Sequence, residues 1–134
     1  MINLLFETSL NSPLGELGLL AEDNYLIELS LMGLKGLSHR GKPEKERFKV
    51  ERQELTQYFS KKRDSFTFQI QIGGTDFQKS VFNNMKTIKY GKVLTYKELA
   101  KKVGKPKAYR AVGSACGANK IPIVIPCHRV VSST

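Results

Sequence analysis

The sequence of 134 residues has no tryptophan, two cysteines and two histidines, and these scarcities limit the kinds of site that it can hold. Cys116, Cys127, His39 and His128 are the residues best suited to bind soft metals, and their spacing matches no common zinc pattern. No glycine-rich phosphate loop precedes an expected helix, and no pair of acidic residues is placed for hydrolysis. We therefore expect neither a metal nor a cofactor.

Long apolar stretches are also missing. No run approaches the ~18 apolar residues that span a bilayer, and the first residues lack the pattern of a secretory signal. We therefore expect a cytoplasmic protein with no membrane partner, in which the two cysteines are free thiols. The length suffices for one compact domain or two small lobes, and we expect a monomer.

Acidic residues are few relative to basic ones. The chain has 22 Lys and Arg against 12 Asp and Glu, which gives a net charge of +10. Such a surplus favours a polyanionic partner, and nucleic acid is the commonest one. A basic surface that serves only solubility is the alternative interpretation.

The first half of the chain begins with a pattern typical of strands. Alternating apolar residues over 17–21 and an apolar run over 26–31 flank a turn at Asp23–Asn24, and together they predict a hairpin. Residues 33–43 combine glycine, proline and basic residues, and they predict a loop.

A charged helix and one more strand are expected before the chain reaches its second half. Residues 44–62 have a sparse apolar stripe at helical spacing, which predicts the helix. Strict alternation over 66–72 predicts a half-buried strand. The Gly73–Gly74 pair ends this pattern, so we place a boundary there between lobes 1–73 and 74–134.

The second half predicts helices. Asp76 is placed to cap the first of them, which Tyr90–Gly91 would end. Thr95 and Glu98 form a capping box, in which each side chain can bond to an unpaired helix amide. We expect Gly104 to end this second helix in a left-handed conformation.

A third helix is expected over 106–118, and with the second it would form a helix-turn-helix. Its small residues are Ala108, Ala111, Gly113, Ser114, Ala115, Gly117 and Ala118. A helix that reads the major groove normally carries long polar side chains, whereas this one has a single long charged residue, Arg110. The pattern fits docking in the minor groove with one inserted side chain, or tight helix packing beside an exposed arginine.

Cys127 follows an apolar segment, 121–126, that is bounded by prolines and predicts a strand. A thiol reacts as its thiolate, and a free cysteine titrates near pH ~8.5, so a base or positive charge must lie nearby; His128 and Arg129 are candidates. Adjacent residues of an extended chain point to opposite sides. Either the chain turns at Pro126 or a water links the thiol to the imidazole, which argues against a papain-like protease. An inert buried thiol is the alternative interpretation.

The segment Pro126-Cys-His-Arg-Val130 resembles the active-site signature of the O6-alkylguanine-DNA alkyltransferases. The similarity covers about residues 75–134, including Thr95–Ala100 and Ala108–Gly113, whereas the first lobe is similar only in layout. The resemblance implies an α+β fold. A strand-rich, ribonuclease H-like lobe would precede a helical, winged-helix-like lobe that carries the helix-turn-helix.

The resemblance also implies roles for individual residues. Cys127 would accept an alkyl group once from O6 of guanine in duplex DNA, or from O4 of thymine, and His128 would remove its proton through a water. Tyr96 would lie beside the flipped nucleotide, Arg110 would fill the space that it leaves, and Asn119 would brace the turn before the cysteine. Further DNA contacts would come from Thr95, Ala108, Ala111, Ser114 and Arg129, and pocket walls from Pro126 and Val130.

Members of that family continue past the signature with a glycine-rich loop and an acidic residue that orients the histidine. The sequence ends at Thr134 and contains neither feature, so slow transfer, or DNA binding without transfer, is left open as an alternative to full activity. A non-catalytic, alkyltransferase-like protein that binds the lesion is one alternative, although such proteins replace the cysteine. A helix-turn-helix regulator of transcription is another, and the small-residue helix and the Cys-His-Arg sequence argue against it.

Overall fold

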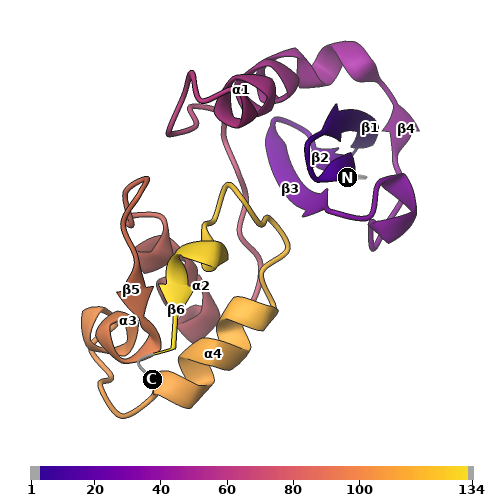
Figure 1. Cartoon of the computed structure of the whole chain (residues 1–134). Helices are drawn as coiled ribbons and strands as arrows, with labels where there is room; N and C mark the ends of the chain where they lie inside the picture. The colour runs from indigo at the N-terminus through magenta and orange to yellow at the C-terminus, as the bar shows by residue number, and fades with distance from the viewer. Residues whose placement is uncertain (1–3, 133–134) are drawn as a thin grey trace. The chain divides into compact units, whose positions relative to one another are not determined.

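The computed structural model describes residues 4–132, and the chain divides into two compact units, Met1–Gln71 and Ile72–Thr134. The first unit contains a four-stranded sheet and one α-helix, and the second contains three α-helices and two short strands (Figure 1). A sheet and a helical group that occupy separate parts of the chain confirm the predicted α+β class. The expected lobes, 1–73 and 74–134, differ from these units by two residues.

The sheet of the first unit has the strand order β3-β2-β1-β4. Its strands are β1 (Leu5–Ser12), β2 (Gly15–Glu22), β3 (Tyr25–Ser30) and β4 (Lys42–Pro43). The antiparallel pairing of β2 with β3 confirms the predicted hairpin, and β4 pairs parallel to β1. The sequence pattern misses β1 because Glu7 interrupts it; in the fold this carboxylate is buried and accepts hydrogen bonds of 2.7 Å from Arg40.

Helix α1 (Lys49–Phe59) is shorter than the predicted helix over 44–62. The residues before it, Lys45–Phe48, form the 3-10 helix η2, and a further 3-10 turn, η1 (Leu34–Gly36), lies in the segment expected to be a loop. Phe48, the residue before α1, and Leu55 within it are fully buried, so burial of a few apolar side chains fixes a helix whose other residues are mostly polar or charged.

The predicted strand over 66–72 is wrong. In the described chain this segment makes one isolated parallel bridge, between Ile70 and Leu26 of β3. The rings of Phe66 and Phe68 lie 5.4 Å apart, and Phe66 also stacks on Tyr58 of α1 at 5.2 Å. The aromatic residues that suggested a strand therefore pack on each other and on a helix, and they leave no continuous ladder.

The second unit packs three helices around one small core. They are α2 (Asp76–Met85), α3 (Tyr96–Lys102) and α4 (Tyr109–Gly117). Strands β5 (Leu94–Thr95) and β6 (Val130–Val131) pair in parallel, and the 3-10 helix η3 (Cys127–Arg129) precedes β6. The buried core residues are Val81, Phe82, Met85, Ile88, Leu99, Ala100, Val112, Ala115, Ile121, Ile123, Ile125 and Val130.

Local capping interactions set the helix ends, which differ in part from the predicted ranges. Thr95 and Glu98 form the predicted capping box, and Gly104 has the predicted positive φ, at +85°. The cap of α2 is Thr75, one residue before the predicted Asp76, because Gln78 is then placed to complete a capping box. Helix α2 ends at Met85, well before Tyr90–Gly91, since the next amides bond in tight turns.

The start of α4 is also later than predicted. The predicted range began at Pro106, but residues 106–107 form a turn that the amide of Ala108 closes on the carbonyl of Lys105, at 2.9 Å. The helix begins at Tyr109, and no side chain caps it. Helices α3 and α4 follow one another with this turn between them, and their assignment as a helix-turn-helix stays a prediction.

Candidate functional site

The segment before Cys127 is a turn and not the predicted strand. The amide of Ile125 donates to the carbonyl of Ile121 at 2.9 Å, and Ile123 has a φ of +75°. Pro122 and Pro126 have no backbone N–H to donate to a neighbouring strand, so a β-strand in this segment would lack two of its hydrogen bonds. The buried isoleucines instead fix a compact loop against the core of the second unit.

Asn119 closes this loop with both ends of its side-chain amide. Its Nδ2 donates to the carbonyl of Ile125 at 2.8 Å, and its Oδ1 accepts from the amide of Ile121 at 2.9 Å. The side chain is half-buried, and it lies directly after α4. These two bonds close the loop before Cys127, and the role of Asn119 in the reaction stays a prediction.

Cys127 lies in η3, where the chain turns. Pro126 has a φ of −82° and a ψ of 69°, and the amide of Arg129 donates to its carbonyl at 2.9 Å. The sharp turn at Pro126 that the sequence allowed is present. The Cys127 side chain is half-buried, and His128 is exposed to solvent on one side and partly covered by its neighbours. No direct hydrogen bond joins the two within the described chain, so a link through a water stays a prediction.

The two thiols have different environments. Burial, and then the charge of Cys127, raise the pKa of Cys116 to about 11, and its Sγ lies 3.6 Å from Sδ of the buried Met85. Cys116 therefore stays protonated at neutral pH, as a packed side chain. Cys127 is also half-buried, but it lies directly before His128 and Arg129.

His128 is held in its neutral form. Partial burial lowers the pKa of the imidazole, and the neighbouring charge of Arg129 lowers it further. A neutral imidazole has a nitrogen lone pair that can accept a proton. At neutral pH His128 is therefore able to act as a base, directly or through a water.

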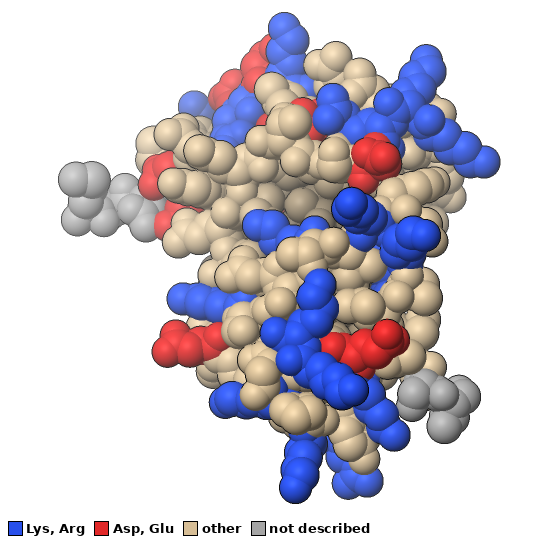
Figure 2. All heavy atoms as spheres, turned by 90° about the vertical axis from the view of Figure 1, so that its left-hand side faces the viewer, with Lys and Arg blue, Asp and Glu red and all other residues tan. Residues whose placement is uncertain are grey.

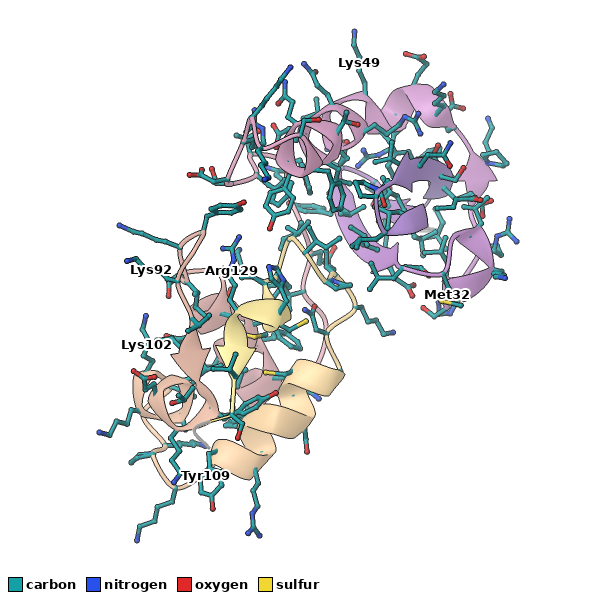
Figure 3. All side chains as sticks on the ribbon, in the orientation of Figure 1. Met32, Lys49, Lys92, Lys102, Tyr109 and Arg129 are labelled. Carbon is teal, nitrogen blue, oxygen red and sulfur yellow. The ribbon has the colours of Figure 1, made fainter. Side chains whose placement is uncertain are left out.

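Arg129 anchors η3 to the chain that follows α2. Its Nη1 donates to the carbonyl of Ile88 at 2.7 Å, and its Cζ lies 5.6 Å from the ring centre of Tyr90 (Figure 3). The guanidinium is thus engaged within the second unit, and a contact with DNA stays a prediction. The sequence does not predict this hydrogen bond, because Ile88 accepts it through its backbone carbonyl, which every residue has.

The β5–β6 pair brings distant parts of the site together. Leu94 pairs with Val130 and Thr95 with Val131, so the chain before Tyr96 lies beside the chain after Cys127. Val130 is buried. Tyr96 is half-buried against α4, where a Cβ built on Gly113 would lie 3.9 Å from its Cε1 atom.

Helix α4 turns its small residues outward. Its exposed small-residue face consists of Ala111, Ser114, Gly117 and Ala118. Val112 and Ala115 face the core, and Arg110 is exposed at the start of the helix. Tight packing accounts for the buried side only. The exposed face therefore supports docking on a narrow surface, which was one of the two interpretations left open.

The net positive charge of the protein comes entirely from the second unit. Ten of the 22 basic and ten of the 12 acidic residues belong to the first unit, so the second holds 12 basic residues and two acids, Asp76 and Glu98. Every one of those basic residues except Arg129 is exposed. Figure 2 shows one face of the molecule, on which blue lysine and arginine side chains outnumber red acidic ones.

Metal-binding clusters and membrane-spanning helices are both absent from the described residues. Between residues 4 and 132, no group of three or more His, Cys, Asp or Glu residues is placed to hold a metal ion. In the same range, no helix is long and apolar enough to cross a membrane.

Comparison with known proteins gives two family matches and several close relatives. Residues 5–72 match the ribonuclease-like domain of 6-O-methylguanine DNA methyltransferase, and 76–134 match its DNA binding domain. A methylated-DNA–protein-cysteine methyltransferase of Methanosarcina barkeri is 43% identical over 92% of this chain and 80% of its own length. The inducible enzyme of that name in Bacillus subtilis is 36% identical over 81% of this chain and 71% of its own.

Solved structures agree with these matches. The Mycobacterium tuberculosis O6-methylguanine methyltransferase has 32% sequence identity and a TM-score of 0.87, over 97% of this chain and 80% of that one. The M. tuberculosis OGT in complex with DNA has 34% identity and a TM-score of 0.88, over 96% of this chain and 79% of that one.

Proposed function

Because the chain belongs to the 6-O-methylguanine DNA methyltransferase family, we propose that Cys127 is the residue that accepts the methyl group. The activity of the chain is single-turnover transfer of a methyl group from DNA to one of its own cysteines, and DNA is its partner. The observation that carries the choice of Cys127 is the difference in the neighbours of the two half-buried thiols: Sγ of Cys116 lies against the buried Met85 and its pKa is raised, whereas Cys127 lies in the turn η3 directly before a neutral imidazole.

The proposed substrate is O6-alkylguanine in duplex DNA, with O4 of thymine as an alternative. His128 takes the thiol proton of Cys127 through a water. The thiolate sulfur then forms a bond to the alkyl carbon, the carbon–O6 bond breaks, and its electron pair passes to the guanine. We propose that the Tyr96 hydroxyl gives the leaving base a proton. The product is a thioether, which no residue here reverses, so each molecule reacts once.

Reaction at O6 requires that the nucleotide leave the base stack, which costs a few kcal/mol. We propose that the exposed small-residue face of α4 docks in the minor groove and that Arg110 fills the vacated space. The absence of bulk on that face, and the exposure of Arg110, support this. Thr95, Ala108, Ala111, Ser114 and Arg129 are the other proposed DNA contacts, and Pro126 and Val130 the proposed pocket walls.

The excess charge of the second unit supports the same assignment, because nucleic-acid binding depends on neutralised phosphates. Asn119 joins α4 to the cysteine loop by its two hydrogen bonds, so we propose that it keeps the thiol in register with the docked helix. We also propose that the protein works as a monomer in the cytoplasm.

The decisive experiment mixes the full chain with a duplex that contains one O6-methylguanine. We expect a gain of about 14 Da, one methyl group, on the peptide that contains Cys127. Cys127→Ser should abolish the gain, and Cys116→Ala, the matched control at the packed thiol, should keep it. Methyl transfer to Cys116, or lesion binding with no transfer by the unaltered chain, would contradict the assignment; the second result would favour a binding protein without catalysis.

A further inference from the structure

Tyr109 is the exception on a helix otherwise almost free of bulk. It is the first residue of α4 and the only aromatic one between Tyr109 and Gly117. Its side chain is 36% exposed, so it does not belong to the core that Val112 and Ala115 face. Figure 3 labels Tyr109 at the first turn of α4, and Arg110 is the next residue of the helix.

Two positive charges lie against this one ring. The ammonium nitrogen of Lys97, from α3, is 5.5 Å from the ring centre, and the guanidinium carbon of Arg110 is 5.9 Å from it. Both distances fall within the range at which a cation is attracted to the negative face of an aromatic ring. The ring therefore holds together two like charges that would otherwise repel each other.

We propose that Tyr109 is a positioning residue that holds Arg110 over the small-residue face before DNA arrives. This inference rests on the proposed function, because it deepens the role of Arg110 in replacing the flipped base. An arginine side chain loses considerable rotamer freedom when it becomes fixed in a complex. If the Tyr109 ring already restricts the guanidinium in the free protein, less side-chain entropy is lost when DNA binds. The resulting gain in affinity for DNA applies only to the complex in which Arg110 is inserted.

Lys97 completes the arrangement from the other helix. Its contact with the ring joins α3 to the start of α4, so the aromatic side chain is held from both helices of the helix-turn-helix. This contact gives the ring a neighbour on α3 in addition to Arg110 on its own helix.

The test uses Cys127→Ser protein, which binds the lesion without consuming it. Affinity is measured for a duplex with one O6-methylguanine and for the same duplex unmodified, and a fluorescent base beside the lesion reports unstacking. We expect Tyr109→Leu to weaken lesion binding about two- to fivefold and to lower the unstacking signal, with the unmodified duplex unchanged. Tyr109→Phe, which keeps the ring, should behave as the parent. Tyr25→Leu, at an exposed tyrosine of the first unit, is the matched control.

A double-mutant cycle separates positioning from general damage. In an Arg110→Ala background, Tyr109→Leu should have no further effect on lesion binding. An effect that persists there, an equal effect on both duplexes, or tighter lesion binding by Tyr109→Leu would overturn the inference. If Arg110→Ala weakens lesion binding and Tyr109→Leu does not, the inference fails and the proposed function stands. If Arg110→Ala itself has no effect, this inference and the proposed role of Arg110 both fail, whereas the assignment of Cys127 is tested separately by the methyl gain on its peptide.

Discussion

The side-chain amide of Asn119 donates a hydrogen bond of 2.8 Å to the backbone carbonyl of Ile125, two residues before the reactive thiol. Since the Asn119 carbonyl oxygen also accepts from the amide of Ile121, one side chain closes the whole loop. The loop has no strand ladder of its own, and its geometry depends on these two bonds. The relationship ties the end of α4 to the position of Cys127.

We predict that Asn119→Leu slows methyl transfer and lowers the free energy of unfolding by about 1–3 kcal/mol, because two backbone groups lose their partners. Asn119→Asp keeps the acceptor for Ile121 and loses the donor to Ile125, so its effect should be smaller. Urea unfolding and single-turnover kinetics measure the two quantities. Asn83→Leu, at an exposed position of α2, is the control, and an equal loss there would argue against a specific role.

Arg129 offers a second test of how η3 is held. Arg129→Met removes the 2.7 Å hydrogen bond to Ile88 and the contact with Tyr90, and we expect it to destabilise the protein by about 1.5–3 kcal/mol and to slow transfer. Arg129→Lys keeps the charge but not the planar group, so it should recover transfer only in part. If Arg129→Met instead weakens DNA binding and leaves unfolding unchanged, its role is in the interface and not in the anchor.

The lowered pKa of His128 sets an expectation for the pH dependence of the reaction. The rate of transfer should rise as His128 loses its proton and should level off below the pH of about 6.5 at which an ordinary histidine titrates. His128→Gln should be slow and should lose this rise, whereas His39→Gln, at an exposed histidine of the first unit, should keep it. A rate profile that is the same for His128→Gln and the parent would exclude a role as base.

The same shift has a consequence for stability. The folded protein binds fewer protons at His128 than the unfolded chain does, because the pKa is lowered on folding. The contribution of His128 to the free energy of unfolding is therefore fully present above the pKa of the histidine in the unfolded chain. It is lost as the pH falls through the lower pKa of the folded protein. Denaturation at several pH values, with His128→Gln for comparison, measures this contribution.

Salt dependence tests whether the second unit carries the DNA contacts. Lys107 is exposed one residue before the cap of α4, and we predict that Lys107→Gln reduces the slope of log affinity against log salt by about one phosphate contact. Lys35→Gln, at an exposed lysine of the first unit, should leave the slope unchanged. Equal changes for both variants would place contacts on the first unit as well.

Local chemistry explains why some features could be predicted from the sequence. The capping box of Thr95 and Glu98 and the positive φ of Gly104 need only residues within one helical turn. The hairpin of β2 and β3 needs only its two strands and the turn between them. The signature around Cys127 indicated the family, because a signature consists of residue types and does not depend on the backbone conformation that they adopt.

The two predicted strands that failed share one physical cause. Alternation over 66–72 and the apolar run at 121–126 satisfy the side-chain requirements of a strand, but a strand also needs a partner for its backbone groups. In the fold, aromatic stacking occupies the first segment, and two prolines and Asn119 close the second into a loop. No local pattern contains that information.

The sequence by itself determined the charge of the chain, the helix caps, the small-residue helix with its single arginine, and the identity of the residues around Cys127. Only the tertiary structure decided which thiol is packed, that Arg129 reaches Ile88 across 41 positions of sequence, and that Lys97, Tyr109 and Arg110 meet at one ring. The reason is physical. Propensity and caps depend on near neighbours, whereas burial, shifted pKa values and long-range contacts exist only after the chain has closed on itself.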